Sequence, residues 1–569
     1  MRILFVISLA TLLGTGCGEP LPTHTSAHAT VDGGAEPDAG APVHWVACPL
    51  YVDQPNGLQA ECATIDVPLR WSEPDGPTIG IFVQRLKGLA AERRGQLWLL
   101  EGGPGGSGAD FDGFMEQFRT LDPTLDLYAV DHRGVGRSAR LSCPDQEGEA
   151  SAGGFNITDA EWPACIAALQ AEWGPDLAEF TTTAAARDVG RLLEVTREPG
   201  KQSFVYGVSY GTYWAHRYLQ LFPSQATAVV LDSIAPPGED FTHYDVDYNA
   251  VGQDLMDVCA ADALCSSKLG ADPWAALGHL FDLLDQGHCP ALTQTLGFDR
   301  MYLRYSLGVL LMSVDTRAFI PAVAYRFERC DDADVAAITQ LSSVLFGQQQ
   351  LTYYDTLMST ALFNNVAISE LWPESAPPLA EFLAEVDGLF ASIDLSPRVA
   401  ALQDAWPRYP DDAYVGQWAT TDLPLLMMNG DLDPQTPIWV GSQADPHFNG
   451  ANQRFYTIPR AAHCTIAQSP VSTAGAQDCG MQLLLGFLAD PLVAPDDSCL
   501  ADLAPVDFTG NAAYSQYLFG TADMWDDATA RAPKGEGSPP PSLQRSLRSV
   551  RPWLTPLPLP HADGLRSRP

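Results

Sequence analysis

The chain has 569 residues, 46% of them hydrophobic and 18% charged, which suffices for one large domain with an insertion or for two domains. Its 70 acidic residues outnumber 32 basic ones and give a formal net charge of −38. A surface this negative repels phosphate backbones, so the composition argues against nucleic-acid binding and favours a soluble protein that works outside the cell.

The first 17 residues predict an export signal. Arg2 precedes an apolar run at 3–13, which is too short to span a bilayer and has the length of a signal-peptide core. The following stretch, LLGTGCG, resembles a bacterial lipoprotein signal in which Cys17 becomes lipidated, and plain signal cleavage is the alternative. Either signal predicts an envelope lipoprotein or a secreted protein that touches a membrane only through an N-terminal lipid.

Eleven cysteines remain after Cys17, and none has the C-x-x-C spacing of a zinc site. An exported chain favours disulfides, so neighbouring cysteines are expected to pair. We predict no metal site and no cofactor, and Cys464 is left without a partner. The expected pairs are Cys48–Cys62, Cys143–Cys165, Cys259–Cys265, Cys289–Cys330 and Cys479–Cys499.

Short apolar runs alternate with helical patterns along most of the chain, which predicts an α/β fold with a doubly wound, mostly parallel sheet covered on both faces. Functional groups should then lie in loops beyond the carboxyl ends of the strands. The strand-like runs lie at 76–86, 95–103, 125–138, 203–211, 226–234, 423–431 and 454–459.

Nearly 190 residues between Ile234 and Leu423 contain helical stretches such as DPWAALGHLFDLLDQ and PPLAEFLAEVDGLFASI. They predict a large, mainly helical cap inserted between late strands, and a separate domain with its own activity is the alternative. The expected division is a signal at 1–17, a flexible linker at 18–43, core at 44–235, cap at 236–415, C-terminal core at 416–530 and a disordered Pro/Arg-rich tail at 531–569.

The stretch SFVYGVSYGTYW places Ser209 between a predicted strand and a predicted helix, with Gly207 and Gly211 on either side. This is the context of a nucleophile elbow, where glycines allow strand and helix to close together. A free helix N-terminus behind the serine also favours developing negative charge. The pattern therefore predicts Ser209 as a catalytic nucleophile.

A serine nucleophile needs a base and an orienting carboxylate, which in this topology follow in the order serine, acid, histidine. His463 follows the last predicted strand, whereas His447 precedes that strand and His561 lies in the tail, so His463 is the predicted base. The acid should leave the preceding strand, where Asp431 and Asp433 are both candidates.

Two N–H donors should stabilise the oxyanion. Tyr210, directly after the nucleophile, is expected to supply one, and the glycine-rich loop EGGPGGSG after the strand at 95–100 is expected to supply the other. No phosphate-loop lysine follows these glycines, so nucleotide binding is not indicated.

Together, GGPGGSG at 102–108, DHRGVGRS at 131–138, GVSYG and GDLDPQTP at 430–437 resemble the α/β-hydrolase fold. More narrowly, they resemble the secreted bacterial tripeptidyl-aminopeptidase and proline-iminopeptidase group with its TAP-like C-terminal segment. The resemblance implies a triad of Ser209, Asp433 and His463, with oxyanion donors near Gly103 and Tyr210.

The resemblance also implies an exopeptidase that releases residues or short peptides from free N-termini through an acyl-enzyme. Carboxylates, usually from the cap, are implied to bind the substrate ammonium group. Glu101, where relatives commonly have histidine, either binds such an amine or is a solvated turn residue. Two alternatives are an esterase or amidase for small apolar acyl groups and a non-catalytic binding protein on the same fold.

Overall fold

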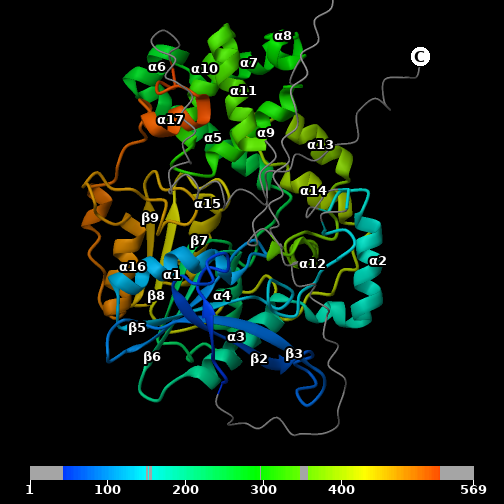
Figure 1. Ribbon diagram of the computed structural model, residues 1–569, viewed down its shortest axis with the longest axis vertical. Helices are drawn as coiled ribbons and strands as arrows, with labels where there is room; N and C mark the ends of the chain where they lie inside the picture. Colours follow the sequence, from blue (N-terminus) through cyan, green and yellow to red (C-terminus); the bar gives the residue numbers. More distant parts are fainter. Residues whose placement is uncertain (1–42, 149–150, 153–156, 295–296, 347–355, 526–569) are drawn as a thin grey trace, which may run out of the picture. The chain divides into compact units, whose positions relative to one another are not determined.

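A computed structural model describes residues 43–148, 151–152, 157–294, 297–346 and 356–525 of the chain (Figure 1). The predicted signal with Cys17, the C-terminal tail with His561 and nearly all of the predicted linker lie outside the described residues. Within these ranges, no helix combines the length and apolar character that crossing a bilayer requires.

The described strands form one nine-stranded sheet in the order β1-β2-β3-β5-β4-β6-β7-β8-β9. Pairing is antiparallel from β1 to β5 across β2 and β3, and parallel from β5 to β9. The strands are β1 (Val46–Pro49), β2 (Gln59–Pro68), β3 (Thr78–Leu86), β4 (Gly95–Leu100), β5 (Leu125–Val130), β6 (Gln202–Ser209), β7 (Ala228–Ile234), β8 (Leu425–Gly430) and β9 (Gln453–Ile458).

All seven predicted strands are present, and the predicted fold class is confirmed. Strands β1 and β2 were not among the predicted ones. The sequence of β2, QAECATIDVP, does not alternate cleanly between apolar and polar residues, because this strand is buried only in part on each face.

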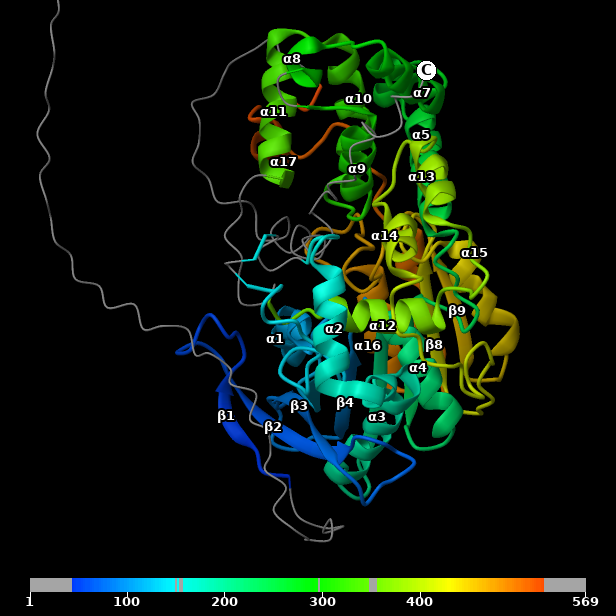
Figure 2. The same cartoon turned by 90° about the vertical axis from the view of Figure 1, so that its right-hand side faces the viewer.

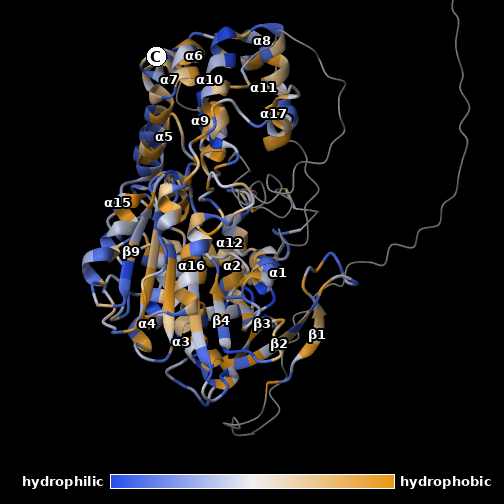
Figure 3. Cartoon of the chain, turned by 90° about the vertical axis from the view of Figure 1, so that its left-hand side faces the viewer, coloured by the Kyte–Doolittle hydropathy of each residue, from blue (hydrophilic) through white to orange (hydrophobic). Residues whose placement is uncertain are grey.

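Helices cover both faces of the sheet, because successive residues of a strand point to opposite sides. In β4, Leu97 and Leu99 pack in one hydrophobic cluster with residues of α1 and α16, whereas Trp98 and Leu100 pack in another with α2, α3 and α4. The central strands are correspondingly hydrophobic in Figure 3. These helices, with the short α15, are α1 (Asp112–Leu121), α2 (Trp162–Trp173), α3 (Thr182–Thr196), α4 (Tyr210–Leu221), α15 (Ile438–Gly441) and α16 (Cys479–Ala489).

The chain between β7 and β8 is mainly helical, as predicted for the inserted cap, and the two predicted helices are α7 and α13. At the start of α7, Asp272 accepts the Ala275 N–H and Pro273 is the first residue, which is a typical helix start. The cap helices are α5 (Tyr244–Ala261), α6 (Ala263–Leu269), α7 (Pro273–Asp285), α8 (Pro290–Thr293), α9 (Arg300–Leu311), α10 (Ile320–Arg329), α11 (Asp332–Phe346), α12 (Thr360–Glu370), α13 (Leu379–Asp387) and α14 (Leu395–Leu402).

The end of the described chain differs from the expected division, which assigned 416–530 to the core. Helix α17 (Ala512–Phe519) lies beside α11 of the cap (Figures 1 and 2), where Gln340 donates to the Tyr517 carbonyl at 3.2 Å. The buried guanidinium of Arg326 also binds the Met524 carbonyl at 2.6 Å. The apolar residues of this segment are buried, and Phe519 and Trp525 pack against the cap residues Phe319 and Tyr325.

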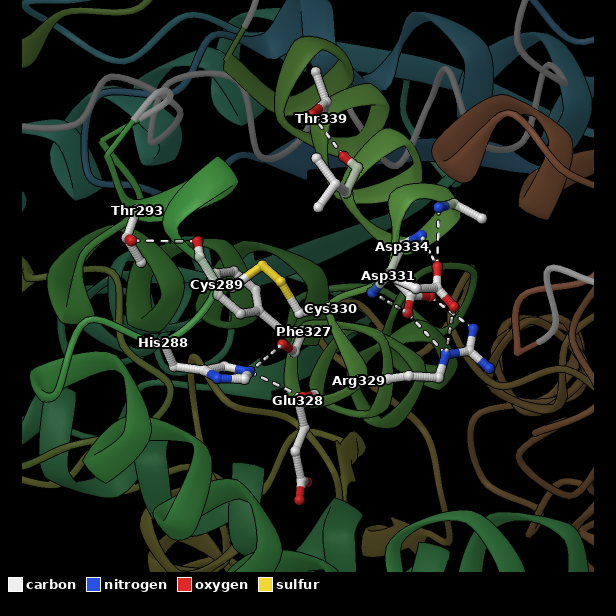
Figure 4. Close-up of a disulfide and its surroundings, with 12 residues drawn as sticks. His288, Cys289, Thr293, Phe327, Glu328, Arg329, Cys330, Asp331, Asp334 and Thr339 are labelled. Carbon is white, nitrogen blue, oxygen red and sulfur yellow. Dashed lines mark hydrogen bonds and ion pairs between the residues drawn. A yellow bond between two sulfur atoms is a disulfide. The ribbon is translucent and has the colours of Figure 1, made fainter.

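All five predicted disulfides are present, and Cys464 is free. Figure 4 shows the bond between Cys289 and Cys330, which joins the start of α8 to the end of α10. Beside this bond, His288 hydrogen-bonds the carbonyl of Glu328 at 2.9 Å. Disulfides therefore brace the cap as well as the core.

Candidate active site

Ser209 ends β6 and directly precedes α4, with φ 58° and ψ −131°, a backbone conformation that costs energy for a residue with a side chain. The turn is closed by two glycines. A Cβ on Gly207 would lie 2.2 Å from the Gly211 carbonyl oxygen, and one on Gly211 would lie 2.1 Å from the Leu100 carbonyl oxygen. This strained turn from strand to helix, with the serine at its tip, is the geometry of a nucleophile elbow.

The glycine-rich loop after β4 packs directly on this serine. A Cβ on Gly102 would lie 2.7 Å from Ser209 Cβ and 3.1 Å from Ser209 Oγ, so a larger residue would displace the hydroxyl. Gly103, the next residue, has φ 115°, which favours glycine. Tyr210 is the first residue of α4, where N–H groups have no partner within the helix. Both predicted oxyanion donors therefore belong to segments that adjoin Ser209.

The Asp433 carboxylate lies against the ring of His463. Both carboxylate oxygens are 2.9 Å from His463 Nδ1. Asp433 is fully buried, and its oxygens also accept hydrogen bonds from the N–H groups of Gln435 and Thr436 and from the Thr436 hydroxyl. Burial alone would raise the pKa of Asp433, but the neighbouring imidazole and these donors hold that pKa below its ordinary value.

The loop that carries His463 is fastened to the carboxyl end of β7. The Cys464 N–H donates to Ser233 Oγ at 2.8 Å, and the Thr465 N–H and hydroxyl donate to Asp232 at 2.9 and 2.6 Å. Burial raises the pKa of Asp232, whereas these donors lower it. The sequence analysis missed this aspartate, although it lies two residues before the carboxyl end of a predicted strand, near which functional groups are expected.

These contacts bring His463 to the strand next to the nucleophile. Ser209 pairs with Ile234 of β7, and Ser233, which holds the backbone of Cys464, directly precedes that residue. The Ser209 hydroxyl has no hydrogen-bond partner within the described residues, and its side chain is partly exposed. Catalytic hydrogen bonds are often long or poorly aligned before substrate binds.

The two candidate acids have different partners. Asp431 accepts a short hydrogen bond from the backbone N–H of Arg460, which begins the loop that leads to His463. Asp431 also interacts with the charge of Arg317 from the cap. Of the two, only Asp433 hydrogen-bonds His463 in the described residues, whereas Asp431 holds the histidine loop.

Glu101 lies beneath the glycine loop and is partly buried. Its Oε1 accepts the Gly102 N–H at 3.0 Å, and a Cβ on Gly106 would lie 2.8 Å from its Cγ. Burial, with the charge of Asp110, raises the pKa of Glu101 to about 8. This environment differs from that of a solvated turn residue, and the predicted substrate-binding role of Glu101 stays a prediction.

Glu239, which the sequence analysis did not identify, has an unpaired carboxylate oxygen near the acid. It lies in the loop after β7, and its Oε2 is buried without a hydrogen-bond partner among the described residues. Burial, together with the charges of Asp247, Asp240 and Asp433, raises the pKa of Glu239 to about 8. Neighbouring Tyr244 interacts with both Glu239 and Asp433. A positively charged ligand group would satisfy this carboxylate.

The remaining histidine candidate lies elsewhere. His447 is at the end of a short 3₁₀ helix before β9, and its ring stacks on Trp418 with 4.1 Å between ring centroids.

In the described ranges, no group of three or more histidine, cysteine or acidic side chains is arranged to hold a metal ion. Of the predicted triad, His463 and Asp433 contact each other directly.

The loop after β5 supports the glycine loop. Asp131 accepts hydrogen bonds from the Ser107 hydroxyl at 2.6 Å and from the Gly108 N–H at 2.9 Å. Arg133 is buried in an ion pair with Asp188. Asp131 and Arg133 therefore hold loops in place through these contacts.

Comparisons with known proteins match parts of the chain. A family model of the alpha/beta hydrolase fold matches residues 97–266. The chain is 32% identical over 248 residues to a tripeptidyl aminopeptidase of Streptomyces lividans, covering 39% of this chain and 45% of that protein. It is 28% identical over 274 residues to serine protease Hip1 of Mycobacterium tuberculosis, covering 44% and 51%.

A shorter match, 33% identical over 142 residues, is to carboxylesterase B of Mycobacterium tuberculosis and covers 23% of this chain and 26% of that protein. The chain therefore spans about half the length, or less, of the curated relatives it matches. Among solved structures, the alignment with a proline iminopeptidase of Mycobacterium smegmatis covers 71% of this chain and 92% of that protein. The sequence identity is 14% and the TM-score is 0.32.

The fold follows from the strand order, from the nucleophile elbow between β6 and α4, and from the match to the family model. The chain has the α/β-hydrolase fold, and part of its sequence is similar to tripeptidyl aminopeptidases.

Proposed function

We propose that the protein is a serine hydrolase in which Ser209 is the nucleophile, His463 the general base and Asp433 the orienting acid. The observation that carries this proposal is the buried carboxylate of Asp433, 2.9 Å from His463 Nδ1 through both oxygens, on loops that end beside the elbow. Such a carboxylate fixes the tautomer with the proton on Nδ1, which leaves Nε2 free to accept the serine proton.

In the first half-reaction, Ser209 Oγ attacks the substrate carbonyl carbon while His463 takes the hydroxyl proton. The backbone N–H groups of Gly103 and Tyr210 would stabilise the oxyanion of the tetrahedral intermediate. His463 then gives the proton to the leaving amine or alcohol, and an acyl-enzyme remains. Water, activated by the same histidine, releases the acyl group and regenerates Ser209.

The proposed substrates are peptides with a free N-terminus. Two of the similar proteins are named tripeptidyl aminopeptidase and serine protease. Glu239 supports this choice, because its buried, unpaired oxygen lies close enough to Asp433 for their charges to interact. A substrate ammonium group would pair with that carboxylate and lower its pKa, whereas a neutral ester offers it no partner.

An esterase or amidase for small apolar acyl groups is the second candidate, favoured by the match to a carboxylesterase. Chromogenic substrates separate the two. We expect tripeptidyl or aminoacyl p-nitroanilides to be cleaved and their N-acetylated forms to be cleaved at least about 10-fold more slowly, because the charged hydrogen bond is lost. Turnover of p-nitrophenyl esters alone would contradict the exopeptidase proposal.

We also propose that the protein is exported, because five disulfides form where the chain folds in an oxidising compartment. A lipid on Cys17 would hold it at the cell envelope. Metabolic labelling with a clickable fatty acid should label the wild-type protein and fail to label Cys17→Ser. An unlabelled wild-type protein in the culture medium would contradict the lipid anchor.

A further inference from the structure

Helix α12 belongs to the inserted segment but lies apart from most of the cap. In Figures 1 and 2 it lies below α9 and α14, at the level of α2. All of its residues from 361 to 370 are buried, including the polar Asn365 and Glu370. A helix that is buried on all sides contacts core and cap together, and each of its ends touches a segment of the candidate site.

The start of α12 holds the glycine loop. The Ser359 N–H donates to the Gly105 carbonyl at 3.0 Å, and a Cβ on Gly105 would lie 2.4 Å from the Ser359 carbonyl oxygen, so the two backbones are in direct contact. The Ser359 hydroxyl donates to the Leu141 carbonyl at 2.7 Å, and the Gly136 N–H donates to the Leu357 carbonyl at 3.0 Å. The first oxyanion-donor segment is therefore tied to this end.

The last residue of α12, Glu370, binds the nucleophile helix. Its Oε2 accepts the Tyr213 hydroxyl at 3.1 Å and Arg217 Nη2 at 3.2 Å, both from α4. Its Oε1 accepts the Thr182 N–H at 3.0 Å and the Tyr409 hydroxyl at 2.8 Å. The side chain is 1% exposed. A buried carboxylate with four donors is rigidly oriented, and breaking such a network costs more than breaking a surface ion pair.

The same network reaches the second oxyanion-donor residue. The Tyr210 hydroxyl lies 2.8 Å from Thr182 Oγ1, and the Tyr210 ring stacks against that of Tyr213 at 5.9 Å. Glu370 therefore holds Tyr210 through Thr182 and Tyr213. Helix α12 is therefore connected to the loop of Gly103 at its start and to Tyr210 at its end.

We propose that α12 sets the distance between the two oxyanion donors, with Ser359 and Glu370 as positioning residues. This inference rests on the proposed serine hydrolase function. Oxyanion stabilisation depends on donors held at about 2.7–3.1 Å from the developing charge. A small movement of either segment therefore reduces stabilisation of the transition state more than it reduces binding of the substrate.

Two single-hydroxyl deletions on α4 test the proposal. Tyr213→Phe removes the hydrogen bond to Glu370 and the one that the hydroxyl accepts from Arg217 Nη2, which itself binds Glu370. Tyr218→Phe removes a tyrosine hydrogen bond, 3.0 Å to Gln225 Oε1, that is not connected to α12. We expect Tyr213→Phe to lower kcat for a p-nitrophenyl ester about 10-fold with KM unchanged, and to slow fluorophosphonate labelling by the same factor. Tyr218→Phe should leave both rates within about 2-fold of wild type.

Equal rates for Tyr213→Phe and wild type, or equal losses in both variants, would overturn the proposal. Ser359→Ala tests the other end of α12 without altering α4, and it should also lower kcat and the labelling rate with KM unchanged. If Tyr213→Phe does not fold, a wild-type rate in Ser359→Ala would overturn the proposal on its own. A wild-type protein that fluorophosphonate does not label would instead contradict the serine hydrolase function itself.

Discussion

The loops after β8 and β7 each carry a buried carboxylate, and the two side chains differ in their partners. Asp433 accepts hydrogen bonds from Gln435, Thr436 and His463, and its pKa lies below the ordinary value. Glu239 has a buried oxygen without a partner in the described chain, and its pKa is raised to about 8. A satisfied carboxylate is a permanent anion that orients a histidine, whereas an unsatisfied one is available to a cationic ligand.

The largest expected effect comes from neutralising the satisfied carboxylate. Asp433→Asn should fold normally and lower kcat by about 10⁴-fold, because an amide stabilises the wrong tautomer of His463 and cannot balance the imidazolium. Steady-state kinetics with a p-nitroanilide measure the loss, and the variant's circular dichroism should match wild type. A loss of less than about 10-fold would show that another group orients the histidine.

Neutralising the unsatisfied carboxylate should change specificity rather than chemistry. Glu239→Gln should lower kcat/KM for substrates with a free N-terminus by about 10- to 100-fold, because a charged hydrogen bond to the ammonium is lost. The same variant should cleave the N-acetylated substrate at the wild-type rate. Equal losses for both substrates would mean that Glu239 acts on the catalytic residues and not on the substrate amine.

Asp431→Asn tests whether the acid only two residues before Asp433 has a different role. Asparagine keeps an acceptor for the Arg460 N–H, so we expect kcat to fall by only about 2- to 5-fold as the histidine loop loosens. Parallel assays of the two variants under one condition give the comparison. A larger loss in Asp431→Asn than in Asp433→Asn would reverse the assignment of the acid.

The smallest effect is on the pH dependence of stability. The folded-state pKa of Glu239, about 8, lies above the ordinary value of 4.5, so its contribution to stability is complete below pH 4.5 and is lost as the pH rises through 8. Glu239→Gln does not ionise and should gain about 2–4 °C in Tm relative to wild type between pH 5 and pH 9. The exposed Glu385→Gln is the control and should show no such difference.

The sequence predicted the parts of the site that follow local rules. A serine between glycines, at a change from strand to helix, predicts the elbow without any knowledge of tertiary contacts. The expectation of export, together with the spacing of neighbouring cysteines, likewise predicted all five disulfides, of which Cys259–Cys265 closes the shortest loop. The histidine was predictable from the order of strands, because only His463 follows the last strand outside the tail.

The remaining parts depend on contacts that no local pattern records. Asp431 and Asp433 occupy the same turn, and only their partners separate them. Glu239 lies in the sequence APPGED, which is typical of an exposed turn, but its Oε2 is buried in the folded chain. Glu370 is the one charged residue of α12, and its partners on α4 are more than 150 residues away in sequence.

The central claim, that Ser209 is the nucleophile, is tested most directly by locating the adduct of a fluorophosphonate probe in the intact protein by peptide mass spectrometry. We predict one adduct, on the peptide that contains Ser209, with no labelling of Ser209→Ala and much slower labelling of His463→Ala. An adduct on another residue, or an undiminished adduct in Ser209→Ala, would contradict the proposed site.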